Sequence, residues 1–185
     1  MYGRAYGKKR WIFISGVILL AGVIVLWRAG FFSSSPTDSR EVSALDARSL
    51  PSVVVQNEAG GSVSLADTIV GKPAIIALWA SWCPFCKDEF PKLKMMKEMF
   101  GDALVVVAVN RGESIETVAK SGAASALGAN IAVVRDADDA LYAAVGGFSM
   151  PEMIFVDKDG KIREQWRGPI REEELRRHSA ELIGH

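Results

Sequence analysis

The chain has 185 residues, 49% of them hydrophobic and 24% charged, and this composition excludes a disordered tail and a low-complexity fibre. Its formal net charge is zero, but the first 28 residues hold five basic residues and no acidic one, which leaves 17 basic against 22 acidic side chains in the remainder. A mildly acidic remainder excludes a basic nucleic-acid surface, and two cysteines are too few for a disulfide-stapled scaffold or a four-cysteine zinc site.

The first predicted element is an apolar helix. Seventeen uncharged residues run from Trp11 to Trp27 and would span about 25 Å, which is short but sufficient for a bilayer core. The tryptophans at both ends suit the membrane interfaces, and the basic residues at positions 8–10 favour a cytoplasmic N-terminus. We therefore predict a cytoplasmic segment at residues 1–10 and a single transmembrane anchor at residues 11–32. The rest of the chain would then lie on the periplasmic, extracytoplasmic side of the inner membrane.

Two other interpretations of this run are open. A cleavable signal peptide normally has 7–15 apolar residues, and Arg28 stands where its cleavage site would be expected. A buried core helix would have no polar face to turn toward water. Both alternatives fit less well than an uncleaved anchor.

Beyond the anchor, the sequence predicts a linker and one globular domain. Residues 33–51 begin with a polar run that cannot build a core, whereas residues 52–185 are long enough for a single domain. Apolar runs predict strands at Val53–Val55, Ser62–Leu65, Ala74–Trp79, Leu104–Val109, Ile131–Val134, Met153–Val156 and Lys161–Trp166. Helices are predicted at Cys83–Phe100, Ser114–Leu127, Asp138–Val145 and Arg171–Ile183.

The order of these elements predicts an α/β fold. Ala74–Trp79 and Leu104–Val109 are continuous apolar runs, which are typical of parallel strands buried on both faces. Gly60-Gly61 indicates an N-terminal hairpin, and Asp157–Gly160 indicates a second hairpin between the last two strands. We expect a mixed sheet flanked by helices, parallel in its centre and antiparallel at one edge. Pro91 should kink the helix that contains it.

The pattern most informative about function is Trp82-Cys83-Pro84-Phe85-Cys86, between a predicted strand and a predicted helix. Cys83 would lie at the helix N-terminus, where unpaired N–H groups and the helix dipole favour the reactive thiolate. Pro84 suits the first helical turn. Cys86, one turn further along, can attack a mixed disulfide on Cys83 and release a reduced substrate. The pair therefore predicts thiol–disulfide exchange without a bound cofactor or metal.

Other roles of a cysteine pair fit these residues less well. A structural disulfide across two residues would close too small a loop to stabilise much. A c-type haem would need a histidine where Lys87 stands, and zinc would need two more ligands, while His178 and His185 are far away at the C-terminus. A Cu(I) carrier and a dithiol oxidase or isomerase stay open, because the residues between the cysteines do not reveal the reduction potential.

Three further positions are candidate site residues. Glu89 flanks the apolar stripe of the predicted helix and could relay the proton of Cys86, or it could be an ordinary solvent-facing glutamate. A cis bond at Met150-Pro151 would leave the Met150 backbone free to pair with a client, whereas a trans bond would make a plain turn. Glu113 follows the second buried strand, where α/β sites gather, or it is a solvated loop acid.

Together these residues resemble the membrane-anchored TlpA/ResA/DsbE (CcmG) group of extracytoplasmic thiol–disulfide reductases. The resemblance covers about residues 52–183. It depends on Gly71-Lys72-Pro73, the segment Trp79–Cys86, Glu89, Pro151, Asp157 with Gly160, and Gly168. Met150 stands where the group normally carries a small residue.

The resemblance implies a thioredoxin-like fold with an N-terminal hairpin, and it implies a role for each candidate residue. Cys83 would be the attacking thiol and Cys86 the resolving one, Glu89 and Glu113 acids beside the site, and Pro151 the cis-proline. The client-contacting residues would be Trp82, Pro84, Met150, Pro151 and Glu113. The group's usual activity implies electrons received from a membrane thiol–disulfide transporter and passed to a client disulfide, such as that of apocytochrome c or a copper-centre assembly factor.

Overall fold

The computed structural model describes residues 48–69 and 71–184. The predicted cytoplasmic segment, the predicted anchor and the linker up to residue 47 therefore lie outside the described residues. Within the described ranges, no helix is both long enough and apolar enough to cross a membrane.

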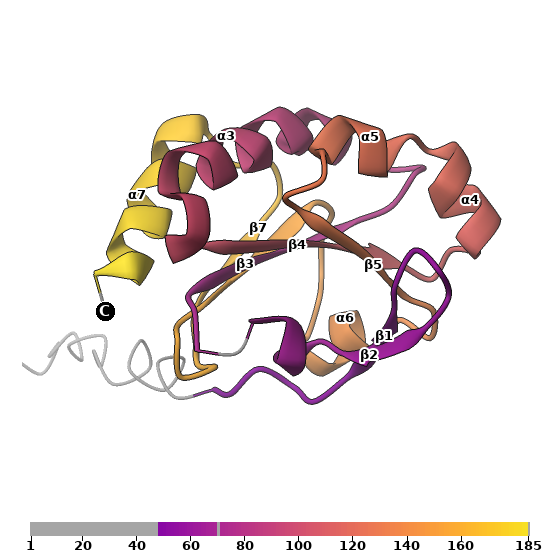
Figure 1. The fold of residues 1–185 in the computed structure, drawn as a ribbon, viewed down its shortest axis with the longest axis horizontal. Helices are drawn as coiled ribbons and strands as arrows, with labels where there is room; N and C mark the ends of the chain where they lie inside the picture. Colours follow the sequence, from indigo (N-terminus) through magenta and orange to yellow (C-terminus); the bar gives the residue numbers. More distant parts are fainter. Residues whose placement is uncertain (1–47, 70, 185) are drawn as a thin grey trace, which may run out of the picture. The chain divides into compact units, whose positions relative to one another are not determined.

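Within the described residues, seven strands form one mixed sheet in the order β2-β1-β5-β4-β3-β6-β7 (Figure 1). The strands are β1 Val54–Gln56, β2 Ser62–Ser64, β3 Ala74–Trp79, β4 Val105–Arg111, β5 Ala132–Asp136, β6 Glu152–Val156 and β7 Ile162–Arg167. β3, β4 and β5 are parallel, as predicted for the centre. β6 and β7 are antiparallel on one side, and the hairpin β1–β2 joins β5 antiparallel on the other. The sheet is therefore antiparallel at both edges rather than one, because the N-terminal hairpin extends the sheet.

Helices cover both faces of the sheet. The α-helices are α3 Phe90–Phe100, α4 Ile115–Lys120, α5 Ala123–Leu127, α6 Ala140–Ala144 and α7 Glu172–Ile183. Short 3-10 turns are η1 Ala66–Ile69, η2 Lys87–Glu89 and η3 Gly101–Ala103. α3, α5 and α7 pack on one face, whereas α6 and η1 pack on the other (Figure 1). This arrangement is the thioredoxin-like α/β fold that the sequence predicted.

The hydrophobic core has two halves, one on each face of the sheet. Successive residues of β3 point to opposite faces. Ile75 and Trp79 contribute to the half beneath α3, and Ile76 and Leu78 to the half beneath α6. Each fully buried aliphatic side chain of this kind stabilises the fold by about 1.5–3 kcal/mol. The continuous apolar run of β3 thus buries this strand on both faces. The cysteines follow directly at its C-terminal end.

The helix predicted at Cys83–Phe100 begins later than expected. Its α-helical part starts at Phe90 and is preceded by the 3-10 turn η2. Pro91 lies in the first turn of α3, where a missing N–H leaves no hydrogen bond unmade. The predicted kink at Pro91 is therefore wrong: the proline starts the helix instead of interrupting it.

The helix predicted at Ser114–Leu127 is two short helices. Ser114 caps α4, since its side chain accepts a hydrogen bond from Thr117 N at 3.2 Å. Gly122 then takes a left-handed conformation with φ of 74° and separates α4 from α5. Apolar periodicity alone could not locate this break.

The contacts of the domain reach back to Arg48, inside the segment predicted as linker. The Arg48 carbonyl accepts a hydrogen bond from Ile162 N at 2.8 Å, and Leu50 N donates to the Gly160 carbonyl at 2.9 Å. Ser49 forms an isolated bridge with Lys161. Residues 48–50 therefore lie along the start of β7.

Candidate active site

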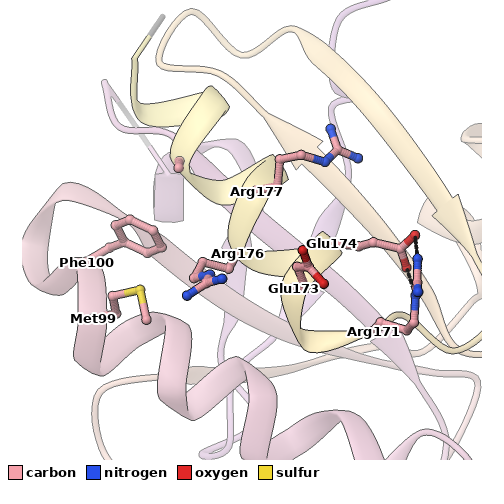
Figure 2. Close-up of a pocket in the computed structure, with 8 residues that line it drawn as sticks. Met99, Phe100, Arg171, Glu173, Glu174, Arg176 and Arg177 are labelled. Carbon is pink, nitrogen blue, oxygen red and sulfur yellow. Dashed lines mark hydrogen bonds and ion pairs between the residues drawn. The ribbon is translucent and has the colours of Figure 1, made fainter.

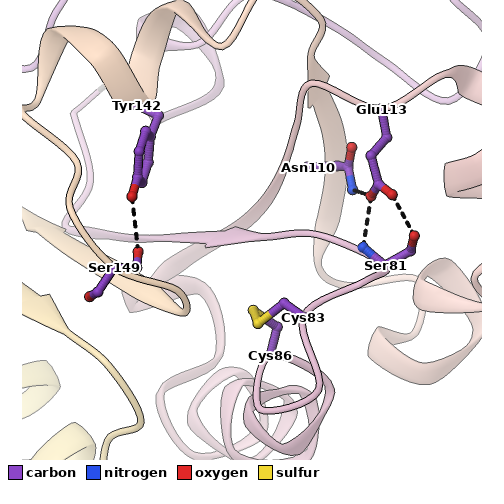
Figure 3. The surroundings of a disulfide bond; sticks show 7 residues. All are labelled: Ser81, Cys83, Cys86, Asn110, Glu113, Tyr142 and Ser149. Carbon is purple, nitrogen blue, oxygen red and sulfur yellow. Dashed lines mark hydrogen bonds between the residues drawn. A yellow bond between two sulfur atoms is a disulfide. The ribbon is translucent and has the colours of Figure 1, made fainter.

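The two cysteines follow the C-terminal end of β3. They are joined by a disulfide with an S–S distance of 2.06 Å (Figure 3). Three tight turns wind this segment, through hydrogen bonds from Cys83 N to Ala80 O at 3.2 Å, Cys86 N to Cys83 O at 3.3 Å and Glu89 N to Cys86 O at 3.2 Å. Cys83 therefore lies at the start of a series of turns that leads into α3, and not at the N-terminus of the helix as predicted. Pro84 likewise lies in these turns and not in the first helical turn.

Both cysteines are buried in the bonded form. Cys83 is 2% exposed and Cys86 1%, because both pack into the core half beneath α3. Trp82 and Phe85, by contrast, are 63% and 57% exposed, and Pro84 is exposed as well. Little of Cys83 is therefore exposed to solvent in the disulfide form. A partner must approach the sulfur past the exposed side chains around it.

Glu89 is a buried carboxylate, so the solvent-facing alternative is wrong. It is 2% exposed and forms an ion pair between Oε1 and Lys92 Nζ at 3.0 Å. Its Oε2 atom is buried and has no hydrogen-bond partner within the described residues. Burial raises the pKa of Glu89, and the hydrogen bond and charge of Lys92 oppose this rise without cancelling it. The sequence did not lead us to predict a role for Lys92, although its i,i+3 spacing from Glu89 is typical of an ion pair on a helix.

The Met150-Pro151 peptide bond is cis, so the plain trans turn is wrong. Pro151 is buried and its carbonyl accepts a hydrogen bond from Gly168 N at 2.8 Å. The Met150 backbone N–H and carbonyl have no hydrogen-bond partner in the part of the chain that the structure describes. Phe148, in the same loop, is 85% exposed. Figure 3 shows Ser149 of this loop and Ser81 on two sides of the disulfide.

The Glu113 carboxylate is hydrogen-bonded within the protein, so the alternative of a solvated loop acid is wrong. Its carboxylate accepts hydrogen bonds from Ser81 N at 2.7 Å, from the Ser81 hydroxyl and from Asn110 Nδ2 at 2.6 Å (Figure 3). Burial works against ionisation, but the hydrogen bonds from Asn110 and Ser81 outweigh it and lower the pKa of Glu113. Glu113 thereby fixes the segment just before Cys83. Its predicted contact with a client stays a prediction, as do those of Trp82 and Pro84.

Glu152 is a further residue of the site that the sequence analysis did not select. It is fully buried, and its carboxylate accepts hydrogen bonds from Gln165 Nε2 at 2.5 Å, Arg167 Nε at 3.2 Å and Phe148 N at 3.3 Å. Arg48 extends this network, because its guanidinium donates to Gln165 Oε1 at 2.5 Å. The network ties the loop before β6 to β7. Glu152 directly precedes the strand predicted at Met153–Val156, and an acidic residue next to a buried strand is the available signal, since a buried charge needs partners.

A separate groove lies between the end of α3 and α7 (Figure 2). It is lined by Met99, Phe100, Arg171, Glu173, Glu174, Arg176, Arg177 and Ala180. Two of its charged side chains, Arg171 and Glu174, form an ion pair with each other at 2.8 Å. None of the predicted site residues lines it, and we assign it no function.

A bonded Cys-Pro-Phe-Cys pair after strand β3, with a cis-proline before the neighbouring strand β6 at the same end of the sheet, defines a thioredoxin-like thiol–disulfide oxidoreductase. The family model of AhpC/TSA proteins matches residues 47–165, and the chain belongs to this family.

Individual relatives agree with this assignment. The chain is 28% identical over 166 residues to the thiol-disulfide oxidoreductase ResA of Bacillus subtilis, covering 89% of each chain. It is 29% identical over 166 residues to the thiol:disulfide interchange protein DsbE of Pseudomonas fluorescens biotype C, covering 89% of this chain and 88% of that one. A crystal structure assigned as DsbE from Chlorobium tepidum matches with a TM-score of 0.67 and 25% identity, over 75% of this chain and 98% of that one.

These relatives confirm an enzyme of the ResA/DsbE type, as the sequence predicted. Such enzymes work with a redox-active cysteine pair rather than a bound cofactor. Across residues 48–69 and 71–184, no group of three or more His, Cys, Asp and Glu side chains is arranged to hold a metal ion.

Proposed function

We propose that this chain is a membrane-anchored reductase that passes two electrons from the thiols of Cys83 and Cys86 to a disulfide in a client protein. One observation carries the proposal: β6 begins opposite Leu78 of β3, so the Met150-Pro151 bond, with the unpaired backbone groups of Met150, lies at the end of the sheet where the bonded cysteine pair follows β3. A redox-active pair next to a free stretch of backbone can both dock a polypeptide and exchange disulfides with it.

The exchange proceeds in two steps. The Cys83 thiolate attacks one client sulfur, which forms a mixed disulfide and releases the other client sulfur as a thiolate. Cys86 then loses its proton and attacks Cys83 Sγ, so the mixed disulfide breaks and the second client thiolate leaves. The client gains two electrons, and the cysteine pair ends as the disulfide. Glu89 accepts the proton of Cys86, and burial supports this role because it raises the affinity of the carboxylate for a proton.

The client docks as an extended segment along the Met150-Pro151 loop. The unpaired Met150 backbone supports pairing of the β type, in which main-chain hydrogen bonds provide affinity. Phe148 and Trp82 are exposed aromatic side chains suited to contact apolar residues near the client cysteines. Apocytochrome c, or a copper-centre assembly factor, is the class of client that the resemblance favours.

The reductase works outside the cytoplasm. The predicted anchor at residues 11–32, with its apolar run Trp11–Trp27, holds the protein in the inner membrane, and the basic residues at positions 8–10 keep the N-terminus in the cytoplasm. The linker then places the domain on the periplasmic side. A membrane thiol–disulfide transporter supplies the electrons that return the pair to the dithiol. Alkaline carbonate extraction tests the anchor, since release of the full-length chain from membranes would contradict it.

Thiol trapping in growing cells, combined with a haem stain for c-type cytochromes, tests the function. We expect a mostly reduced pair in the wild type, and loss of mature cytochromes when the gene is deleted. Cys83→Ser should abolish disulfide reduction, whereas Cys86→Ser should accumulate mixed disulfides with clients. A mostly oxidised pair would instead indicate an oxidase, and full activity of Cys83→Ser would refute the dithiol mechanism.

A further inference from the structure

We propose that Lys92 is a positioning residue for the second step of exchange, because it holds the Glu89 carboxylate in the place from which that carboxylate accepts the Cys86 proton. The inference rests on the proposed function, since Cys86 gives up a proton only when it resolves a mixed disulfide.

The Lys92 ammonium is fixed at two points. Its Nζ lies 3.0 Å from Glu89 Oε1 and donates a hydrogen bond to the Ile170 carbonyl at 2.6 Å. Ile170 is buried and precedes α7, so the second point belongs to a different part of the chain from η2 and α3. A lysine held at both points cannot move about as a surface lysine does. The Glu89 side chain is therefore fixed from one side.

Lys92 contacts only one of the two oxygens of the Glu89 carboxylate. Oε1 faces Lys92, whereas Oε2 is buried and has no hydrogen-bond partner among the described residues. Glu89 N donates to Cys86 O at 3.2 Å, so the two residues are related by a turn of 3-10 type. In such a turn the side chains at i and i+3 lie one above the other. The i,i+3 relation therefore places Glu89 above Cys86, and Oε2 is the carboxylate oxygen that Lys92 does not hold.

The charges around Glu89 are few. Lys92 and, to a smaller extent, a backbone hydrogen bond from Ile170 favour the ionised carboxylate, and Asp88 disfavours it. Burial is the largest influence and raises the pKa of Glu89. Without Lys92, burial would act with less opposition and the carboxyl would stay protonated to a higher pH. A protonated Glu89 cannot take a proton, so the resolving step would need a higher pH.

The proton passes from Cys86 Sγ to the Glu89 carboxylate, and the resulting thiolate attacks Cys83 Sγ. The new bond joins the two cysteines, the bond from Cys83 to the client breaks, and the electron pair leaves with the client thiolate. The proton on Glu89 is then released to that thiolate or to water.

Ellman's reagent, used with the reduced full-length chain in detergent, measures the two steps separately. Cys83 releases the first thionitrobenzoate, and Cys86 releases the second when it resolves the mixed disulfide. We expect Lys92→Met to slow the second phase about tenfold near neutral pH and to shift its pH profile upward. Lys92→Arg should restore the profile. Lys94→Met, which removes an exposed lysine of the same helix, is the matched control and should behave as wild type.

The result that overturns the proposal is a wild-type pH profile for the second phase in Lys92→Met. An unchanged profile in Glu89→Gln would remove Glu89 itself from the mechanism, and a second phase that persists in Cys86→Ser would refute the dithiol exchange. These three results can be distinguished, because each is measured in a different variant. The first phase reports whether the site is intact, and Lys92→Gln gives a second uncharged variant if Lys92→Met does not fold.

Discussion

The carboxylate of Glu113 accepts hydrogen bonds from both the backbone amide and the hydroxyl of Ser81, two residues before Cys83. Glu113→Gln keeps the shape of the side chain but replaces one acceptor oxygen with a donor that faces other donors. We expect the free energy of unfolding to fall by about 1–3 kcal/mol, because Ser81 and Asn110 lose their acceptor. Urea denaturation measures this loss. Glu98→Gln, at an exposed position of α3, is the control and should change stability by less than about 0.5 kcal/mol.

The contribution of Glu113 should also depend on pH. Its pKa is lower in the folded than in the unfolded chain, where the ordinary value is 4.5. A lowered carboxyl pKa stabilises the fold above the unfolded value, and this stability is lost as pH falls through the folded value. The stability difference between wild type and Glu113→Gln should therefore be full at neutral pH and shrink below about pH 4.5. A difference that stays constant in acid would show that the carboxylate charge contributes nothing.

Glu89→Gln should have the opposite effect on stability. The pKa of Glu89 is raised in the folded state, so stability falls as pH rises from 4.5 through the folded value. Removing the buried charge should stabilise the protein at neutral pH, by on the order of 1 kcal/mol, while slowing the resolving step. Lys92 keeps its hydrogen bond to Ile170 and partial access to water, which limits the cost of losing its partner. A variant that is less stable than wild type at neutral pH would contradict this account.

Much of the fold could be predicted from local sequence. The buried run of β3 and the turn at Asp157–Gly160 depend on residues that lie close together in the chain, and both are as expected. The cysteine pair was also evident, because the position of two cysteines after a buried strand is itself a local pattern. The break at Gly122 was missed, since the flanking residues continue an apolar periodicity that a glycine does not interrupt.

The parts of the site that could not be predicted depend on contacts between distant segments. Arg48 meets Gln165 across 117 positions of the chain, and Lys92 meets Ile170 across 78. Nothing in the local sequence of either basic residue indicates such a partner. Glu152 stands just before the strand predicted at Met153–Val156, so the sequence alone does not place it in the sheet. Its partners on β7 follow from the pairing of β6 with β7. Burial of the cysteines was likewise not evident, because it arises from the packing of the whole domain.

Gly147 has no room for a side chain. A Cβ placed there would lie 2.3 Å from Cδ2 of the Tyr142 ring, far inside van der Waals contact. Gly147→Ala should therefore displace the loop before Pro151, reduce stability by about 1–3 kcal/mol and slow reduction of a protein disulfide such as that of insulin. Tyr142→Leu removes the ring and should restore part of the loss, and a double-mutant cycle measures that coupling. Purely additive effects of the two substitutions would mean that the ring does not constrain position 147.

Phe148 should bind clients without taking part in the chemistry. It is 85% exposed, in the loop that also carries the unpaired Met150 backbone. Phe148→Ala should raise the KM for a protein disulfide several-fold, since an exposed aromatic side chain loses its contact area only when a partner covers it. The reaction with Ellman's reagent should be unchanged, because a small disulfide does not need the docking surface. Val54→Ala, on β1 at 67% exposure, removes exposed apolar surface from the hairpin instead and should leave both reactions as in wild type. Equal losses with insulin and with Ellman's reagent in Phe148→Ala would indicate damage to the site itself, and unchanged kinetics with insulin would place client docking elsewhere on the domain.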